Sequence, residues 1–490
     1  MQQLFSLIQI DKAGKQPVYL QLANQLLALI SNGTLRPGEK LPPTRQFASQ
    51  LKVNRQTIVK GFDELLLQGW LQSKMGSGTF IAHHLPQVKP PGNLAAPPAK
   101  KASLVAGFSF NDAPHLHREA TPNTTFHLDD GFPDARLAPL EQLSRAYRSQ
   151  LLTGNRYTRL SYNDPKGTLW LRQQLSTYLH ETRGFNITHE NILITRGTTM
   201  ALYLACTALL KKGDIVAVAE ANWRGGNMNF VHAGAKLVTI PVDEYGLDVA
   251  ALKMVCMSQK VRMLYITSHH QYPTTVALSA NRRVELLTLA EKYGFIIFED
   301  DYDYDFHYLS KPLLPLAAAD SAGMALYAGS FTKAVSPAFR VGYLVAPENV
   351  INHLALFRRV IDRQGDTMLE NAFAELLQNG TLQRHLRKSL RVYKERRDFF
   401  CKLLQEKLSA HISFQVPDGG MAIWAKFNDG INLSSLAARA LKHDLYFYDG
   451  AGYFLTAPRI NSTRLGFASS TPGELEQCVS ILQELLENKI

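Results

Sequence analysis

Apolar residues near the start of the chain recur at the spacing of amphipathic helices. Tyr19, Ala23, Leu26 and Ile30 fall on one helical face, and Asn32-Gly33 supplies a typical end signal. The pattern therefore predicts a first helix that ends at this Asn-Gly pair.

Two shorter apolar patterns follow and predict two more helices. Thr44 comes after two prolines and is predicted as the N-cap of the first, and Asn54 as the N-cap of the second. The apolar positions of these helices are Phe47, Ala48, Leu51, Ile58, Phe62, Leu65 and Leu66. Two short β-type segments, 70–72 and 79–81, then flank a glycine-containing turn. Helix, helix, turn, helix and β-hairpin in this order predict a winged helix-turn-helix domain over residues 1–82.

A change of composition separates this part from the rest. Residues 86–101 hold five prolines and several alanines without helical or strand periodicity. Such a composition is typical of an extended, semi-rigid linker, which spans about 3.1 Å per residue. The polar, irregular segment 102–124 belongs to the same connection. We therefore predict a linker over residues 83–124.

Short apolar runs rich in β-forming residues alternate with helical stretches over residues 125–490. Four of these runs are Ile215–Val218, Leu237–Ile240, Met263–Ile266 and Phe295–Phe298. This alternation predicts an α/β domain with a mostly parallel central sheet. Ligands of such sheets bind at the carboxyl ends of the strands, so the residues after each run are the candidates for chemistry.

Composition argues against a membrane-spanning or disulfide-rich protein. No apolar run approaches the roughly 18 residues of a membrane span, and the four cysteines are far apart. The first residues lack the basic region of a secretory signal, and we expect a cytoplasmic protein. The formal net charge of +11 permits nucleic-acid binding without requiring it. Residues 1–85 contribute +5, from nine Lys/Arg and four Asp/Glu.

The segment Ser330–Lys333, with Arg340 seven residues further on, follows the apolar run 326–328. An unpaired ammonium at the end of a buried strand is costly. An imine with an aldehyde cofactor would remove that charge, and pyridoxal phosphate (PLP) is such an aldehyde. Its phosphate would account for Arg340 and for the hydroxyls of Ser330 and Thr332. The alternative for this segment alone is a surface lysine in a loop.

The acidic run Glu299–Asp305 follows another apolar run. A Ca²⁺-binding loop of the EF-hand type does not fit, because Phe306 and Pro312 stand where its glycine and final glutamate belong. We expect no metal. PLP chemistry needs a carboxylate that keeps the pyridine nitrogen protonated, and it benefits from a phenol near the ring hydroxyl. Asp300 and Tyr302 fit these roles, and the other acids are expected to be solvated or structural.

Two further segments fit the same cofactor. Gly197-Thr198-Thr199 joins the apolar run 192–194 to an apolar helix, and amides and hydroxyls at a helix start suit a phosphate. Trp223 follows the run 215–218, from where it can stack on a flat ring. Each has an ordinary alternative: a helix cap for Gly197-Thr198-Thr199, and a core side chain for Trp223.

The predicted helix-turn-helix points to specific DNA contacts. In this motif the N-terminal part of the second helix reaches base edges in the major groove. The residues in that position are Asn54, Arg55, Gln56 and Thr57. Arginine suits guanine and glutamine suits adenine. We expect Arg45 and Lys60 to contact phosphates, and the turn with Lys74 and Gly76 to enter a minor groove. The alternative is a solvated basic face.

Taken together, these segments resemble MocR-type transcriptional regulators of the GntR superfamily. In that group a GntR-like winged helix precedes a domain similar to fold-type I aminotransferases. The resemblance covers nearly the whole chain except the linker. The segments that carry it are Leu41–Arg45, Trp70-Leu71, Gly76–Phe80, Asp130–Asp134, Arg183-Gly184, Glu299–Asp303, Ser330–Lys333 and Arg464–Phe467.

The resemblance implies a role for each matching residue. Lys333 is implied as the Schiff-base lysine, Asp300 as the partner of the pyridine nitrogen, and Tyr302 as the neighbour of the cofactor hydroxyl. Trp223 occupies the position of an aromatic stacking residue. Arg464 corresponds to the arginine that binds a substrate carboxylate in a two-pronged ion pair. The residues implied around the phosphate are Ser330, Thr332, Arg340, Thr198 and Thr199.

Two further expectations follow from the resemblance. The segment His270–Thr274 is similar to a cofactor-side loop, but Thr275 replaces the usual glycine after it, which leaves the backbone of this loop open. A homodimer is also implied, with the small domains exchanged between subunits. Because one winged helix covers few base pairs, a dimer on paired half-sites of a double-stranded DNA operator is expected.

These observations favour a PLP-dependent, DNA-binding transcriptional regulator. It would sense PLP or an amino compound, such as an amine or amino acid, through aldimine chemistry at Lys333. The first alternative is a PLP-dependent aminotransferase with an accessory DNA-binding domain, because Lys333, Asp300 and Arg464 leave a transamination half-reaction open. The second is a scaffold that binds no cofactor.

Overall fold

The computed structural model of the chain describes residues 2–14, 16–85, 105–111, 113–116, 123–308, 313–455 and 460–487. Its contacts divide the chain into a small unit, residues 1–111, and a large unit, residues 112–490. The division falls inside the connection that was predicted over residues 83–124. The proline-rich part of that prediction, 86–101, lies outside the described residues.

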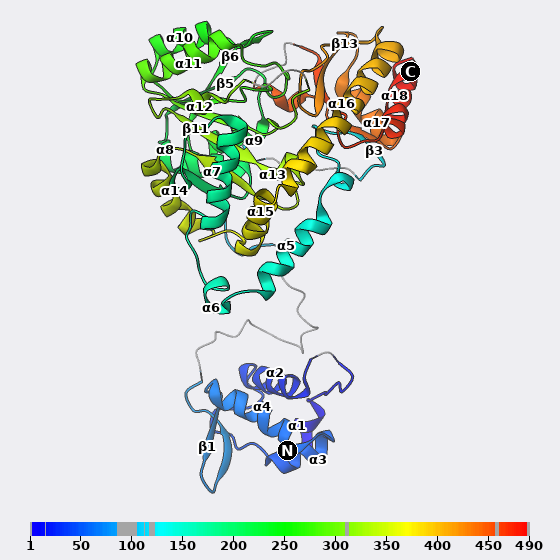
Figure 1. Ribbon diagram of the computed structural model, residues 1–490. Coiled ribbons are helices and arrows are strands. Elements are labelled where there is room, and N and C mark those ends of the chain that lie inside the picture. The colour runs from blue at the N-terminus through cyan, green and yellow to red at the C-terminus, as the bar shows by residue number, and fades with distance from the viewer. Residues whose placement is uncertain are drawn as a thin grey trace. The chain divides into compact units, whose positions relative to one another are not determined.

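The small unit is a cluster of helices followed by a β-hairpin (Figure 1). Its elements are α1 Gln2–Ser6, α2 Val18–Ser31, α3 Thr44–Leu51, α4 Arg55–Leu67, β1 Leu71–Lys74 and β2 Gly78–Ile81. Phe47 is fully buried at the centre, and its ring packs edge-on against Phe5 and Phe62 at centroid distances of 5.0 and 5.2 Å. The predicted order of a winged helix-turn-helix is confirmed.

The two predicted N-caps of this unit have different outcomes. Asn54 caps α4 as predicted, and its side-chain oxygen accepts a hydrogen bond from the backbone N–H of Gln56 at 2.8 Å. The prediction for Thr44 is wrong, because α3 begins at Thr44 itself and Pro43 precedes it as the cap residue. The proline ring fixes an extended entry into the helix and supplies no side-chain acceptor.

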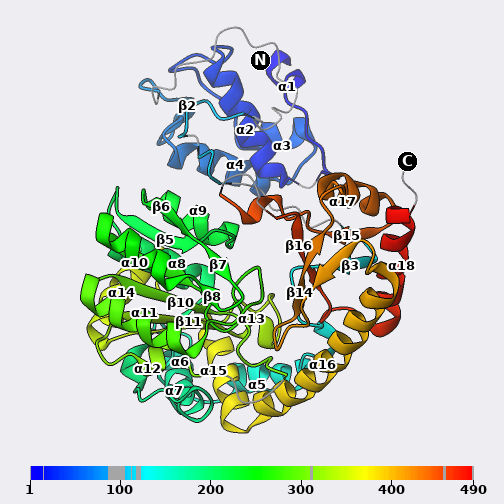
Figure 2. The same cartoon turned by 90° about the horizontal axis from the view of Figure 1, so that it is seen from above.

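The large unit is built on a seven-stranded sheet (Figure 2). In spatial order its strands are β4 Ile192–Thr195, β12 Gly342–Val345, β11 Ala325–Ser330, β10 Ile296–Asp301, β9 Val261–Ile266, β5 Ile215–Ala219 and β6 Lys236–Ile240. β12 runs antiparallel to both of its neighbours, and the other adjacent pairs are parallel. This confirms the predicted mostly parallel α/β sheet.

Helices cover both faces of this sheet. Alternate residues of β5 lie on opposite faces of the sheet. Val216 and Val218 pack toward α8, α9 and α14. Ala217 and Ala219 pack toward α10 and α11 on the other face. The covering helices are α7 Leu169–Arg183, α8 Thr198–Leu209, α9 Arg224–His232, α10 Val249–Ser258, α11 Ala280–Tyr293, α14 Glu348–Ile361 and α15 Thr367–Gln378. Burial on both faces explains why the strands are continuous apolar runs in the sequence.

A second, smaller sheet forms the C-terminal lobe of the large unit (Figure 2). Its antiparallel strands are β13 Ile412–Phe414, β14 Ala422–Phe427 and β16 Ser462–Gly466, and the helices beside them are α16 Thr381–Leu408, α17 Leu433–Lys442 and α18 Pro472–Glu487. β3 Phe126–Leu128, which follows the connecting segment, pairs in parallel with β15 Leu445–Phe447. The remaining short elements are α5 Leu140–Leu152, α6 Arg156–Arg159, β7 Val242–Asp243, β8 Gly246–Leu247, α12 Leu316–Ala319 and α13 Phe331–Ala334.

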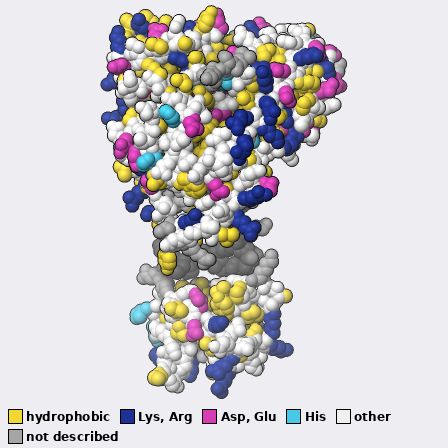
Figure 3. All heavy atoms as spheres, in the orientation of Figure 1, with side chains coloured by type: hydrophobic (Ala, Val, Ile, Leu, Met, Phe, Trp, Pro, Cys, Tyr) yellow, Lys and Arg dark blue, Asp and Glu magenta, His cyan; other side chains and the backbone are white. Residues whose placement is uncertain are grey.

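The first half of α16 exposes a run of basic side chains, Arg384, Arg387, Lys388, Arg391 and Lys394. Its second half exposes the acids Glu395, Asp398 and Glu406 as well. Figure 3 shows Lys and Arg side chains gathered over this helix. The positive charge of the chain is therefore not confined to the small unit. Within the described residues, no helix is long and apolar enough to cross a membrane.

The loop after β9 has the backbone that a glycine would adopt, although Thr275 occupies the position. Thr275 has φ +65°, in the left-handed region, and its N–H donates to the carbonyl of Gln271 at 2.7 Å. A β-branched residue is disfavoured in this region. The loop therefore keeps the turn although threonine stands in place of glycine, and the backbone of Thr275 is strained.

The strain at Thr275 predicts opposite effects of glycine at two adjacent positions. Thr275→Gly removes a cost of about 1 kcal/mol and should leave the thermal midpoint unchanged or slightly raised. Thr274→Gly, the matched control, has no left-handed backbone to relieve, and should lower stability by about 0.5–1 kcal/mol. Thermal unfolding of both variants followed by circular dichroism tests this, and equal destabilisation would contradict it.

Candidate cofactor site and DNA-binding surface

The strand order brings the predicted cofactor residues to one edge of the seven-stranded sheet. Because β12 is antiparallel, its amino end lies beside the carboxyl ends of the other strands. The register places Ser330, Gly342 and Thr195 side by side across β11, β12 and β4. Two predicted residues, Asp300 and Ser330, lie in the last positions of β10 and β11. The others lie next to the strand ends at this edge: Gly197, Thr198, Thr199, Trp223, Tyr302, Thr332, Lys333 and Arg340.

Lys333 lies on α13, immediately after β11. Its Nζ donates to the carbonyl oxygen of Gly131 at 2.7 Å and lies 4.1 Å from the ring centroid of Phe132. Burial lowers the pKa of Lys333, although the carboxylates of Asp130 and Asp129 oppose the fall. A lowered pKa increases the fraction of neutral amine, which is the form that attacks a carbonyl carbon.

Asp300 has a buried carboxyl group with one oxygen that lacks a hydrogen-bond partner among the described residues. Its Oδ2 accepts a hydrogen bond from the hydroxyl of Tyr265 at 2.8 Å, and its buried Oδ1 has no partner among the described residues. Burial raises the pKa of Asp300 to about 7. An unpaired buried oxygen is costly, and a protonated ring nitrogen is the donor that PLP brings to such a site. The residues present therefore fit the cofactor here.

The acids that follow Asp300 are structural rather than solvated. Asp301 accepts a hydrogen bond from the hydroxyl of Tyr327 at 2.8 Å, and Asp303 lies 2.8 Å from Nδ1 of His270. Both carboxyl groups are buried. Nowhere in the described ranges do three or more His, Cys, Asp or Glu residues form a group suited to a metal ion.

The two predicted aromatic residues lie at the same edge. The hydroxyl of Tyr302 donates to the carbonyl of His270 at 3.0 Å. Trp223 is half-buried and packs at the border of a core cluster between the sheet and α8. A β-carbon on Gly225 would come within 2.5 Å of the Trp223 ring, so glycine at that position is needed for this orientation.

Two of the predicted phosphate residues, Ser330 and Thr332, hold their hydroxyls together. The hydroxyls of Ser330 and Thr332 lie 2.7 Å apart. Gly197 has φ +77°, and a β-carbon there would lie 2.9 Å from Nη2 of Arg340. The arginine can therefore lie directly over the start of α8, where it donates to the carbonyl of Arg196 at 2.8 Å. Arg340 also lines a cavity of about 300 Å³.

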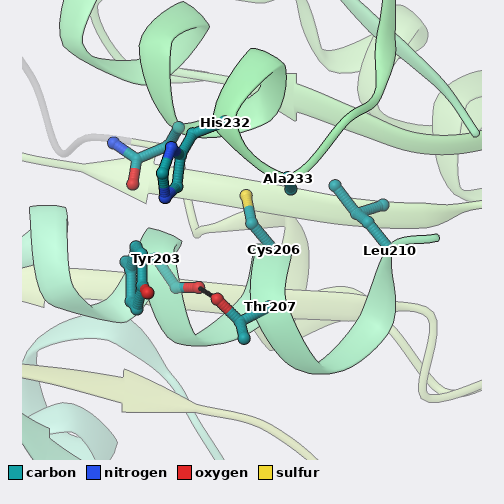
Figure 4. A pocket seen from close by; sticks show the side chains of 7 residues that line it. Tyr203, Cys206, Thr207, Leu210, His232 and Ala233 are labelled. Atoms are coloured by element: carbon teal, nitrogen blue, oxygen red, sulfur yellow. Dashed lines mark hydrogen bonds between the residues drawn. The ribbon is translucent and has the colours of Figure 1, made fainter. Parts of the chain in front are cut away.

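A separate pocket lies away from these residues, between α8 and α9 (Figure 4). Its volume is about 220 Å³, and Tyr203, Cys206 and Thr207 of α8 face His232 of α9 across it. Nδ1 of His232 lies 3.2 Å from Nε2 of His115. None of the predicted cofactor residues lines this pocket.

Arg464 reaches the Lys333 region from β16 of the C-terminal lobe. Its side chain is 1% exposed, and its guanidinium lies 5.0 Å from the ring centroid of Tyr272 and 5.7 Å from that of Tyr302. Its Nε lies 3.2 Å from Oδ1 of Asp130. The sequence predictions included Arg464 but missed Asp130 and Tyr272 as its partners.

The missed partners carried different signals in the sequence. Asp130 stands in the segment Asp130–Asp134 that carried the resemblance, but the sequence does not show which arginine it meets. Tyr265 stands in a run that we treated as apolar. A buried tyrosine hydroxyl needs a hydrogen-bond partner, so that residue was a recognisable signal for a polar neighbour, which is Asp300.

The predicted DNA contacts lie on an open surface of the small unit. Thr57 is half-buried, and the other predicted residues are exposed: Arg45, Asn54, Arg55, Gln56, Lys60, Lys74 and Gly76. Lys74 and Lys40 approach the ring of Phe80 in the hairpin, at 5.3 and 5.8 Å from its centroid. Lys40 was not predicted as part of this surface, because it precedes α3 in the sequence. In the structure it joins the hairpin through a bridge to Phe80.

Both parts of the chain match known families. Residues 131–482 match the family described as aminotransferase class I and II, and residues 18–81 match the family described as bacterial regulatory proteins, gntR family. Among solved structures, the kynurenine aminotransferase of Pyrococcus horikoshii has a TM-score of 0.70 at 26% identity. The match covers 76% of this chain and 92% of that one.

Similar sequences include full-length regulators and a separate enzyme. The probable rhizopine catabolism regulatory protein MocR of Rhizobium meliloti is 27% identical over 97% of this chain and 94% of its own length. The uncharacterized HTH-type transcriptional regulator YisV of Bacillus subtilis is 28% identical over 96% of each chain. Aromatic-amino-acid aminotransferase 1 of Thermococcus litoralis is 26% identical over 78% of this chain.

The combination of the two matches decides the family. The aminotransferase match alone leaves residues 1–130 unexplained, whereas the full-length regulators account for both units. The chain belongs to the aminotransferase class I and II family through residues 131–482 and to the gntR family of bacterial regulatory proteins through residues 18–81, the organisation of MocR-type transcriptional regulators.

Proposed function

We propose that this chain binds PLP in its large unit and uses it to sense PLP itself or an amino compound, with DNA binding as the output. One observation carries the proposal: Lys333, whose amine has a lowered pKa, and Asp300, whose buried Oδ1 has no partner among the described residues, lie at the same end of the paired strands β11 and β10. The DNA-binding unit on the same chain favours a sensor over a metabolic enzyme.

Each residue of the sheet edge has a proposed part in holding the cofactor. PLP supplies an aldehyde that condenses with primary amines and a ring that withdraws electrons. We assign the aldehyde to Lys333, the ring nitrogen to Asp300, the ring hydroxyl to Tyr302 and the ring face to Trp223. The phosphate is assigned to Ser330, Thr332, Arg340, Thr198 and Thr199, with Gly197 allowing the close approach of Arg340.

The proposed switch is competition between an effector amine and Lys333 for the same aldehyde. A free Lys333 would lie beside Asp130 and Phe132 and donate to the carbonyl of Gly131, contacts that a Lys333 held by the cofactor would not keep unchanged. Such a change alters DNA binding only if the effector binds two conformations with different affinity.

For DNA binding, we assign contacts with the bases to Asn54, Arg55, Gln56 and Thr57. We assign contacts with the DNA backbone to Arg45, Lys60, Lys74 and Gly76. A homodimer, with the small units exchanged between subunits, would place two such surfaces on paired half-sites.

The decisive test is the affinity for an operator in three states of the protein. The operator would be selected from a random DNA library by the wild-type chain. Its affinity is then measured by fluorescence anisotropy for the apo protein, the PLP form, and the PLP form with a panel of primary amines and amino acids. We expect at least one state to differ, and three identical curves would rule out the sensor.

An aminotransferase is the second candidate, because Arg464 retains the position of a carboxylate-binding residue beside Lys333 and Asp300. Release of a keto acid over many turnovers would favour the enzyme. A stable change of the cofactor spectrum without turnover would favour the sensor.

Lys333→Ala tests the covalent attachment. Without the ε-amine no imine with the protein can form, so the variant mixed with PLP should lack the absorbance band of the linked cofactor. Lys253→Ala changes an exposed lysine of the large unit and serves as the control, with an unchanged band. A band that survives in Lys333→Ala would refute the assignment.

Asp300→Asn tests the buried carboxyl group through pH. The folded pKa of about 7 lies above the value of about 3.9 for an unfolded aspartate. Between these values the folded apo protein holds one more proton than the unfolded chain, so its stability falls as pH rises. Asp300→Asn should reduce this fall between pH 5 and 8, as measured by thermal unfolding without PLP. Parallel stability curves would show that Asp300 keeps an ordinary pKa. The variant should also bind PLP more weakly.

Arg55→Ala and Lys60→Ala separate base contacts from phosphate contacts. Arg55→Ala should lose roughly 1–3 kcal/mol of operator affinity and little affinity for unrelated DNA. Lys60→Ala should weaken both equally and lower the slope of log affinity against log salt by about 1. Anisotropy titrations at several salt concentrations measure both effects. Equal losses on operator and unrelated DNA for Arg55→Ala would remove it from the base-reading set.

A further inference from the structure

The only guanidinium beside Lys333 that was predicted to bind a ligand carboxylate already has a carboxylate on it. Oδ1 of Asp130 lies 3.2 Å from Nε of Arg464, and Oδ2 of Asp130 accepts a hydrogen bond from the hydroxyl of Tyr272 at 2.7 Å. The Arg464 side chain is 1% exposed and that of Asp130 is 32% exposed. The two atoms of this ion pair are buried, and Nη1 of Arg464 donates to the carbonyl of Pro273 at 3.3 Å, so groups of the chain itself already contact the guanidinium.

The turn that carries Asp130 is held in place independently of Arg464. Oδ1 of the preceding Asp129 accepts hydrogen bonds from the N–H groups of Gly131 and Phe132, each at 2.9 Å. Gly131 has φ +74°, and a β-carbon there would meet the backbone of Met421 at 3.2 Å. Asp130 is thus presented to Arg464 by a fixed turn, so little conformational freedom is lost when the ion pair forms.

We propose that Asp130 sets the effector class: by placing the chain's own carboxylate on Arg464, it makes the site select primary amines without a carboxylate over amino acids. The proposal rests on the function proposed above, in which an amine reacts beside Lys333. An amine without a carboxylate leaves the Asp130–Arg464 pair intact. An amino acid must displace Asp130 or place a second anion beside it.

The competition favours Asp130 for two physical reasons. A carboxylate fixed by the fold acts at a high effective concentration, whereas a free amino acid loses translational entropy when it binds, which weakens its binding. A carboxylate that fails to displace Asp130 is repelled by it, because the positive charge of Arg464 is already paired. Both effects weaken amino acids and leave simple amines unaffected.

The test compares two ligands that differ only by a carboxylate, L-alanine and ethylamine. Each is titrated into the PLP form of the full-length chain, and the cofactor absorbance gives an apparent Kd. In Asp130→Asn we expect L-alanine to bind at least about tenfold more tightly than in the wild type, and ethylamine to change by less than about threefold. The double variant Asp130→Asn/Arg464→Gln should not show the gain for L-alanine.

A second measurement does not depend on the cofactor. Propionate should raise the thermal midpoint of the apo Asp130→Asn variant, and should leave the wild type and the double variant unchanged. Tyr272→Phe, which keeps the charge of Asp130 and removes one of its hydrogen bonds, should give a smaller gain of the same sign. Tyr272→Phe keeps the role of Asp130 testable if Asp130→Asn fails to fold.

The outcomes separate this inference from the proposed function. Equal changes for L-alanine and ethylamine, or a gain that persists without Arg464, would overturn the role of Asp130. Absence of any cofactor band in the wild type would overturn the proposed function instead. The propionate measurement would then still decide whether Asp130 blocks Arg464.

Discussion

The burial of several carboxyl groups around the end of β10 is the constraint on which the rest of the site depends. Glu299, Asp300, Asp301 and Asp303 are all nearly inaccessible to solvent, and a buried carboxyl group must find hydrogen bonds or lose its charge. Their partners come from β9, from the loop that follows it and from β11, so satisfying these acids fixes those elements to one another. Asp300, Asp301 and Asp303 each keep one oxygen without a hydrogen-bond partner among the described residues, and the oxygen of Asp300 is the one that we propose for the cofactor.

Local features of the fold could be predicted from the sequence because the residues that cause them are adjacent. The Asn54 cap, the hairpin of the small unit and the alternation of strands with helices all follow from short patterns. Thr44 shows the limit of such reasoning, since a capping residue type stands there but Pro43 before it already sets the backbone. Thr275 shows another limit, because the surrounding loop imposes a left-handed conformation that threonine does not favour.

The individual cofactor residues could be proposed from strand ends and from the resemblance, whereas their partners could not. Asp130 and Arg464 stand in different parts of the chain, one beside β3 and the other on β16, and nothing in either local pattern points to the other. Their contact depends on how β3 and the turn after it pack against β16 within the C-terminal lobe. The same holds for Lys40, whose position beside the hairpin depends on an isolated bridge to Phe80.

The pairing of β3 with β15 has a mechanical consequence. β3 is the first strand after the segment that joins the two units, and its parallel partner lies more than 300 residues later in the chain. Tension along the joining segment that passes the contact of His115 with His232 would therefore load the hydrogen bonds between residues 126–128 and 445–447. The pulling force would enter the lobe that carries Arg464 and would reach Lys333 through the turn after β3, where the carbonyl of Gly131 accepts the hydrogen bond of the lysine.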